Sequence, residues 1–199
     1  MKPAKTREEW LTRVAQAIEP LIDAAATECG LPLGPEWNYR VSCSWPGGRA
    51  NRNKAIGQCW NRAASKGKVN EIFLSPTIDD PAKAADVITH ELVHAWDDCR
   101  SGHRGTFAKL ARAVGLEGKL TATTAGEALS ARLAGIVDRA GPYPHAGLKA
   151  SAASKAKQTT RMVKIGCQCG VIGRMSRAQI DASTWRCDDC GELVLPTEE

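Results

Sequence analysis

Long apolar runs are absent from this chain of 199 residues. No stretch approaches the roughly 20 consecutive apolar residues that a membrane-spanning helix needs, so we expect no association with a membrane. No hydrophobic signal segment opens the chain, because Met1 to Glu9 is rich in charge and the first apolar residues have amphipathic helical spacing. The sequence therefore predicts a protein of a reducing, cytoplasmic compartment.

Acidic residues are absent between Trp37 and Asn70, a region that holds seven basic ones. Aromatic residues are interleaved with these cations, and such a mixture can neutralise phosphates and stack on exposed bases. We expect contact with DNA here, with single-stranded DNA favoured. The alternative is that the tryptophans belong to the core and the cations are solvated turn residues, since a net charge of +5 is only mildly basic. The candidate contact residues are Arg49, Arg52, Lys54, Trp45 and Trp60.

Histidine is scarce, yet two of the four histidines lie in the segment His90-Glu91-Leu92-Val93-His94. Because each residue of an α-helix advances by about 100°, His90 and His94 present their imidazoles on one face, toward a single metal ion. Glu91 then lies beside that face, where a general base must stand to take a proton from water. The pattern predicts a catalytic zinc site. The alternative is an exposed polar helix face that matches the pattern by accident.

Helical signals surround this motif. Asp79-Asp80-Pro81 offers an acidic N-cap followed by proline at the first helical position. A second helix is predicted from Thr106 to Val114, with Gly115 as its stop. A broad apolar stripe indicates that the back of the metal helix packs on a core while the histidines face a cleft. The stripe consists of Ala84, Val87, Ile88, Leu92, Val93 and Trp96.

A catalytic zinc ion needs a third protein ligand and one open position. His103 follows His94 on the far side of a glycine-containing turn, and this short tether favours His103 as the third ligand. His145, in an irregular stretch between prolines and glycine, is the rival. Asp97 and Asp98 end the metal helix and could orient a histidine, but we interpret them as solvated surface.

Four of the eight cysteines form a second constellation, Cys167-x-Cys169 and Cys187-x2-Cys190, with 17 residues between the two pairs. A glycine directly follows each pair and supplies the backbone freedom that a zinc knuckle needs. Four thiolates make a closed tetrahedral site, so we expect a structural zinc ion in a zinc ribbon. Disulfides are the competing interpretation, which a reducing compartment disfavours.

The other four cysteines show no ligand spacing, and we interpret them as small apolar side chains. They are Cys29, Cys43, Cys59 and Cys99.

Upstream of the metal helix, helical spacing from Arg7 to Cys29 precedes three short extended segments, Tyr39–Ser44, Ala55–Trp60 and Val69–Leu74. Turn residues separate these segments, which predicts a small antiparallel meander. Helices around a three-stranded antiparallel sheet, followed by a small zinc ribbon, make an α+β, zincin-like architecture. We expect the Ala55–Trp60 strand to be the edge that receives an extended peptide.

The composition divides the chain into three parts. Residues 1–145 hold the predicted metal helix and sheet, and residues 161–199 hold the ribbon cysteines. Residues 146–160 are rich in alanine, lysine and serine without apolar periodicity, which is typical of a linker.

The order of strand region, His90-Glu91-Leu92-Val93-His94, Gly102-His103, Phe107 and cysteine cluster resembles the SprT-like zinc metallopeptidases, the Spartan-related family of phage and bacterial type, over roughly residues 37 to 195. The resemblance implies zinc ligands at His90, His94 and His103, with Glu91 as the catalytic acid and base. One departure is Arg104, which stands where family members often have glycine directly after the third ligand.

The expected function is therefore zinc-dependent endopeptidase activity on DNA-bound or DNA-crosslinked proteins, with one catalytic and one structural zinc ion per chain. For a phage-encoded protein, the place of action would be the host cytoplasm. The alternative is a non-proteolytic protein that binds nucleic acid or a polymerase, in which the metal helix is structural. An intact Glu91 argues against that alternative, because a structural zinc site has no use for a general base.

Overall fold

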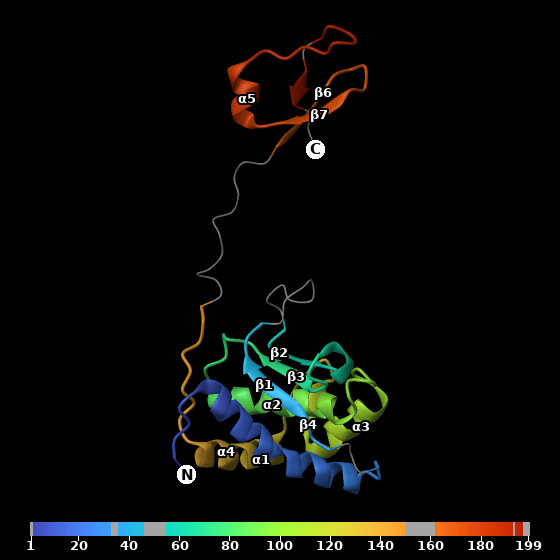
Figure 1. Cartoon of the computed structure of the whole chain (residues 1–199). Coiled ribbons are helices and arrows are strands. Elements are labelled where there is room, and N and C mark those ends of the chain that lie inside the picture. The colour runs from blue at the N-terminus through green and yellow to red at the C-terminus, as the bar shows by residue number, and fades with distance from the viewer. Residues whose placement is uncertain (1, 33–35, 46–54, 150–161, 193, 197–199) are drawn as a thin grey trace. The chain divides into compact units, whose positions relative to one another are not determined.

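The computed structural model describes residues 2–32, 36–45, 55–149, 162–192 and 194–196. The chain divides into two compact units, Met1–Ala150 and Ser151–Glu199. In the described residues the first unit combines helices with two small sheets, and the second combines one helix with one small sheet (Figure 1), so the predicted α+β class is confirmed. None of the helices in the described ranges is long and apolar enough to cross a membrane.

Helix α1 spans Arg7–Glu28, as its apolar spacing predicted. The Thr6 side chain caps its first turn by accepting a hydrogen bond from the Glu9 backbone N–H. Trp10 is fully buried, packs against Tyr143 with tilted rings whose centroids are 4.4 Å apart, and donates its indole N–H to the Gly141 carbonyl at 2.8 Å. These contacts hold the first helix against the segment near residue 143 in a common core.

Three strands, β1 (Tyr39–Cys43), β2 (Gly57–Trp60) and β3 (Asn70–Leu74), form a sheet in the order β1-β3-β2. Strand β1 is parallel to β3 and β2 is antiparallel to it, so the predicted antiparallel meander is wrong. A meander would place β2 in the centre. Strand β3 instead takes the centre because it buries Ile72 and Leu74 completely, whereas β2 carries the exposed Trp60 and suits an edge. A single 3-10 turn at Arg62–Ala64 separates β2 from β3.

Helix α2 (Pro81–Trp96) lies between this sheet and helix α4 (Glu127–Ala140), as Figure 1 shows. It contacts β2 and β3 on one side and α4 on the other, so most of its surface is buried. Helix α3 (Gly105–Val114) follows after a turn and ends at Gly115, whose φ of +100° is readily adopted by glycine. The predicted start of α2 and both predicted ends of α3 hold to within one residue, whereas α2 ends at Trp96, before the Ser101-Gly102 stop that its glycine suggested.

Residues 116–140, where no element was expected from the sequence, form a hairpin of β4 (Leu116–Lys119) and β5 (Ala122–Ala125), and then helix α4. The buried side chains of α4 have helical spacing that could have predicted it: Leu129, Leu133, Ile136 and Ala140. The hairpin gave no such signal, because its two-residue turn lacks glycine, asparagine and aspartate.

The second unit contains β6 (Val163–Gly166), β7 (Ile172–Met175), helix α5 (Arg177–Ala182) and β8 (Leu195–Pro196). Its strands form an antiparallel sheet in the order β7-β6-β8. Ser176 and Gln179 form a reciprocal capping box at the start of α5.

Candidate active site and metal centres

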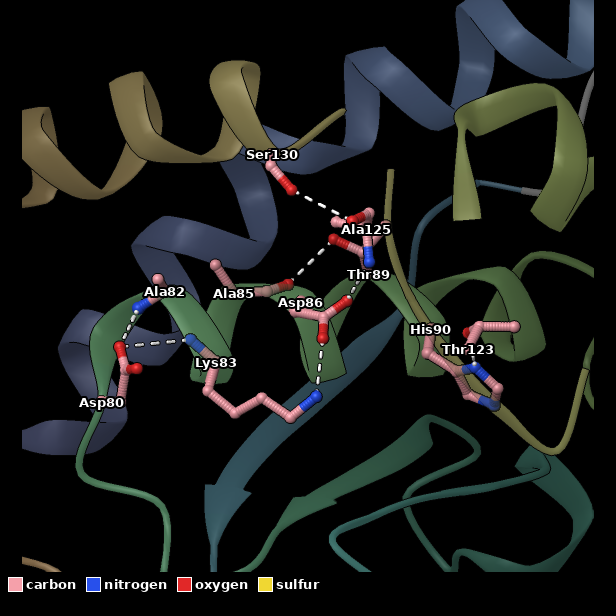
Figure 2. Close-up of polar contacts among 10 residues, drawn as sticks. All are labelled: Asp80, Ala82, Lys83, Ala85, Asp86, Thr89, His90, Thr123, Ala125 and Ser130. Carbon is pink, nitrogen blue, oxygen red and sulfur yellow. Dashed lines mark hydrogen bonds and ion pairs between the residues drawn. The ribbon is translucent and has the colours of Figure 1, made fainter. Parts of the chain in front are cut away.

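The start of α2 is fixed by Asp80, whose carboxylate accepts hydrogen bonds from the backbone N–H groups of Ala82 at 2.8 Å and Lys83 at 3.4 Å (Figure 2). Pro81 occupies the first helical position, where the missing N–H costs nothing. This cap sets where the helix begins and hence which side chains face the core. The apolar stripe is buried, and His90 and His94 share the remaining face.

Three imidazoles converge at one point of the first unit. One ring nitrogen each from His90, His94 and His103 lies within 4.8 Å of the others, and the three could hold a metal ion. The Nε2 atoms of His94 and His103 are 3.2 Å apart. His145, the rival third ligand, lies elsewhere: its Nε2 is 2.9 Å from the Pro76 carbonyl oxygen.

The turn between α2 and α3 brings His103 back over the helix. It contains non-glycine residues with positive φ, Asp98 at +55° and Cys99 at +59°. Asp98 Oδ1 accepts hydrogen bonds from the Arg62 backbone N–H at 2.8 Å and from Asn70 Nδ2 at 2.9 Å, while Asp97 Oδ2 accepts one from the backbone of the same turn. The interpretation of the two aspartates as solvated surface is therefore wrong, because Asp97 accepts a hydrogen bond within the turn and Asp98 joins the turn to residues 62 and 70 of a distant segment.

Phe107 backs the three imidazoles from the first turn of α3. Its ring is fully buried and stacks on His94 with centroids 4.1 Å apart, and it lies 5.1 Å from the rings of both His90 and His103. This apolar wall removes water from the site. Burial, followed by the neighbouring imidazoles, lowers the pKa of His90 to about 4 and that of His94 to about 3, and burial also lowers the pKa of His103.

These histidines fit a zinc ion. Zinc binds the neutral form of imidazole, which low pKa values favour at neutral pH. Two nitrogens on one tetrahedral zinc ion lie about 3.3 Å apart, since each Zn–N bond is about 2.0–2.1 Å, and the Nε2 atoms of His94 and His103 are separated by 3.2 Å. Three nitrogen ligands also leave the fourth position for water or substrate.

Thr123 of strand β5 fixes the orientation of the His90 imidazole. Its Oγ1 lies 2.7 Å from Nδ1 of His90, which leaves Nε2 as the nitrogen of His90 that can face a metal (Figure 2). Strand β5 is itself fastened to α2 by Asp86, which accepts a hydrogen bond from the Ala125 backbone N–H at 2.8 Å and a salt bridge from Lys83 at 2.7 Å. A hydrogen bond to the non-ligating nitrogen fixes the tautomer and orientation of a metal-binding histidine.

Glu91 follows His90 on α2 and lies against the edge strand β2. Its side chain is 5% exposed, and burial, with a smaller contribution from Cys99, raises the pKa of Glu91 to about 8. Strand β2 passes directly over it at Gly57. A cavity of about 290 Å³ opens beside Glu91 and His90, with small or uncharged side chains along the rest of its lining. The lining residues are Ala55, Ile56, Gly57, Val87, His90, Glu91, Thr121, Ala122 and Thr123.

The ribbon cysteines also meet. One sulfur each from Cys167, Cys169, Cys187 and Cys190 lies within 4.8 Å of the others, and the group could hold a metal ion. All eight cysteines lie in the described ranges and are free thiols, so the structure contains none of the disulfides of the competing interpretation. Positive φ values at the two glycines, +92° for Gly170 and +71° for Gly191, close the turns as expected for zinc knuckles.

The structure describes two of the five residues that were predicted to contact nucleic acid. Trp45 and Trp60 line one open groove of about 480 Å³ together with Lys66, Glu71 and Phe73, and Trp60 is 38% exposed. Arg49, Arg52 and Lys54 lie outside the described residues. Two other residues of the acid-free region have structural contacts, since Trp37 donates to Asp23 at 3.1 Å and the Arg62 side chain donates to Asn70 at 3.2 Å.

Two residues of the candidate site, Thr123 and Gly57, were not predicted from the sequence, and Phe107 was predicted without its contacts to the three imidazoles. Thr123 contacts a histidine 33 positions away and lies in a strand without apolar alternation, so no local signal marked it. Comparisons of the chain with protein-family models, with curated proteins and with solved structures find no match. The function therefore has to be inferred from the residues of the chain itself.

Proposed function

We propose that this chain is a zinc-dependent endopeptidase of the SprT-like, zincin type, with His90, His94 and His103 as ligands of a catalytic zinc ion and the four ribbon cysteines as ligands of a structural one. The observation that carries the proposal is the placement of Glu91. Its carboxyl group lines the same cavity as His90, one of the three convergent imidazoles, and lies under Gly57 of the edge strand β2. A purely structural site would need neither the carboxyl group nor the cavity.

The chemistry follows from these residues. Zinc held by the three imidazoles would supply a Lewis acid and a water of lowered pKa. Glu91 accepts a proton from the water that attacks the peptide carbonyl, and then delivers this proton to the leaving nitrogen. Thr123 keeps the His90 ring oriented during both steps. Phe107 keeps bulk water from the back of the site.

Strand β2 supports the binding of an extended substrate. Within the described sheet, β2 pairs with β3 alone, so its other edge is free for the backbone of a peptide. A peptide along this edge would pass Glu91 and place one side chain in the cavity of about 290 Å³. The uncharged walls of the cavity, from Ile56, Val87 and Ala122, favour an apolar side chain next to the scissile bond.

The groove with Trp45 and Trp60 supports action on DNA-bound proteins. Two indoles and Phe73 offer flat faces for bases, and Lys66 offers a charge for phosphate. Trp60 belongs to β2, the strand that also carries Gly57 beside Glu91. A DNA strand in the groove would raise the concentration of its attached protein near the candidate site.

The same groove also favours the second candidate function, a nucleic-acid-binding protein without peptidase activity. The two functions differ in their dependence on Glu91. Binding to DNA does not need this carboxyl group, whereas proteolysis does.

The test is cleavage of a DNA-bound protein substrate by the purified, zinc-loaded full chain. Glu91→Gln should keep two zinc ions per chain and the native fold but lose cleavage by a factor on the order of 100 or more, because an amide cannot accept the proton. Glu117→Gln, at an exposed position of β4, is the matched control and should cleave normally. Equal cleavage by Glu91→Gln and the unmodified chain would refute the proposal.

The ligand assignment has its own test. His103→Ala should lower zinc occupancy at the histidine site, whereas His145→Ala should leave it unchanged, because His145 lies against Pro76. The reverse result would replace His103 with His145. Replacement of Cys190 by serine should disrupt the ribbon without emptying the histidine site.

A further inference from the structure

Two cysteines that are isolated in the sequence meet beside the candidate catalytic site. Cys59 lies on the edge strand β2 and Cys99 in the turn after α2, 40 positions further along the chain. Their Sγ atoms are 3.5 Å apart, and Cys99 Sγ also lies 3.5 Å from the Cys59 carbonyl oxygen. Both are half-buried free thiols, so their interpretation as isolated apolar side chains misses a contact.

The thiol pair joins two segments that carry the candidate site. Gly57 and Cys59 are two positions apart on β2 and therefore face the same side, toward α2, where Gly57 covers Glu91. The Cys99 backbone N–H donates to the His94 carbonyl at 2.8 Å, in the turn that leads on to His103. A bond between the two sulfurs would tie the strand beside the general base to the turn between two candidate ligands.

We propose that Cys59 and Cys99 form a redox-active dithiol, which low-molecular-weight disulfides such as oxidised glutathione convert into an intramolecular disulfide that restrains the candidate active site. The modification does not depend on the proposed peptidase activity. Its effect on cleavage does rest on the proposed function.

The reaction is thiol–disulfide exchange. One of the two cysteine thiolates attacks a sulfur of oxidised glutathione, which forms a mixed disulfide and releases one glutathione. The second cysteine thiolate then attacks the protein sulfur of that mixed disulfide and releases the second glutathione. Two protein thiols are oxidised, one glutathione disulfide is reduced, and the two protons pass to the two released thiols.

The geometry requires a small movement. Sulfur atoms in a disulfide are about 2.05 Å apart, so the two Sγ atoms, now 3.5 Å apart, must approach by about 1.5 Å. Strand β2 is a sheet edge and the Cys99 turn is irregular, so both segments can move without opening a helix. A shift of β2 relative to Glu91 of this size should impair the alignment of a substrate.

The remaining cysteines are poor competitors for this reaction. Cys43 is buried and its sulfur lies 3.8 Å from His145 Nε2, and the Cys29 thiol lies 3.5 Å from the Ala26 carbonyl oxygen. Within the described part of Met1–Ala150, no other two cysteine sulfurs are in contact. The four ribbon thiols would be protected by their metal ion in the zinc-loaded chain.

The test is to incubate the zinc-loaded full chain with oxidised glutathione, block the remaining thiols by alkylation, and map the cysteines by mass spectrometry. We expect a peptide pair linked through Cys59 and Cys99 that lacks two hydrogen atoms, with alkylation at Cys29 as in the untreated chain. The cross-link should raise the midpoint of thermal unfolding by roughly 5–15 °C, because it closes a long loop in the unfolded chain. Dithiothreitol should reverse both changes.

Three variants make the result decisive. Cys59→Ser should leave Cys99 as a stable mixed disulfide with glutathione, and Cys99→Ser should do the same for Cys59. Cys29→Ser, the matched control, should still form the cross-link. The proposal is overturned if the folded chain without substitutions carries glutathione on both cysteines and no cross-link. It is also overturned if the cross-link forms only after denaturation.

Cleavage provides the second measurement. The cross-linked chain should cleave a DNA-bound substrate roughly 10- to 100-fold more slowly than the reduced chain, because displacement of an aligned substrate by about 1 Å has this cost. A cross-linked chain that cleaves at the rate of the reduced chain would overturn the regulatory role while the modification itself stands. Absence of cleavage by the reduced chain would instead refute the proposed peptidase function.

Discussion

Gly57 of strand β2 lies directly against Glu91 of helix α2. A Cβ atom at position 57 would be 2.5 Å from Glu91 Oε1 and 2.5 Å from Val87 Cγ1, closer than real Cβ contacts come. The strand can pass this close to the helix because glycine has no side chain. This contact sets the position of the carboxyl group relative to the imidazoles and to the free edge of the sheet.

We therefore expect Gly57→Ala to impair catalysis without removing the metal. The added methyl group must push either the carboxyl group or the strand away, and a displacement of about 1 Å can lower the rate roughly 100-fold. Steady-state cleavage together with a zinc count would measure both effects. Gly67→Ala is the matched control, because the nearest atom to a Cβ there is 3.5 Å away. Normal cleavage by Gly57→Ala would mean that this close approach is unimportant.

The hydrogen bond between Thr123 and His90 gives a second prediction. Thr123→Val keeps the shape of the side chain but leaves Nδ1 of His90 without its partner at 2.7 Å. Loss of such a hydrogen bond typically weakens metal binding about 10- to 100-fold, because the ring loses its fixed orientation. Competition with a chromophoric chelator would measure the zinc affinity. Thr124→Val, at the exposed neighbouring position, should bind zinc with unchanged affinity.

The elements that the sequence predicted correctly are those with local signals. Helix α2 has its N-cap at Asp80, a proline in its first turn and an apolar stripe, all within one segment. The convergence of His90 with His94 likewise follows from the spacing of one helix. His103 could be preferred because a short tether limits where the chain can go.

What the sequence left undetermined depends on contacts between distant segments. The order β1-β3-β2 depends on which strand has the most deeply buried side chains. The turn residues between the strands do not carry this information and suggested a meander. Cys59 and Cys99 meet because β2 passes the end of α2, although nothing in their spacing marks a pair. Asp98 looked like a surface residue because its partners, Arg62 and Asn70, lie in another part of the sequence.

Glu91 should make the stability of the metal-free chain depend on pH. Its folded-state pKa is raised from 4.5 to about 8, so between these values the folded chain holds a proton that the unfolded chain has lost. The free energy of unfolding should therefore fall as the pH rises through this window. Relative to Glu91→Gln, which has no such titration, the loss should approach about 5 kcal/mol at most, the value of a shift from 4.5 to about 8.

Urea unfolding at several pH values, with chelator present, would measure this difference. The histidines have lowered pKa values and titrate in the opposite sense, but they are common to both proteins and cancel in the comparison. Added zinc should flatten the dependence, because a nearby cation favours the ionised carboxylate. If the free energy of unfolding of Glu91→Gln and of the chain without substitutions changed with pH in parallel, burial would not raise the pKa of the Glu91 carboxyl group.

The groove that contains Trp45 and Trp60 leads to the last prediction, that single-stranded DNA binds there and stimulates cleavage. Stacking of one base on an indole contributes about 1–3 kcal/mol, so Trp60→Ala should weaken DNA binding roughly 5- to 150-fold and reduce stimulation in parallel. Fluorescence anisotropy with a labelled oligonucleotide would measure the affinity. Leu148→Ala, which truncates another exposed apolar side chain of the first unit, should bind DNA normally.

The basic residues of the acid-free region should contribute separately from the indoles. The affinity for DNA should fall steeply with added salt. Joint charge reversal at Arg49, Arg52 and Lys54 should reduce the slope of log affinity against log salt concentration by about two, as expected for three lost phosphate contacts on a single strand. The same variant should still cleave a short unstructured peptide, because these residues are not in the proposed catalytic machinery. Cleavage that proceeds equally well without DNA, with no salt-sensitive binding, would make the chain a general zinc peptidase and would leave the Trp45–Trp60 groove without a role in substrate choice.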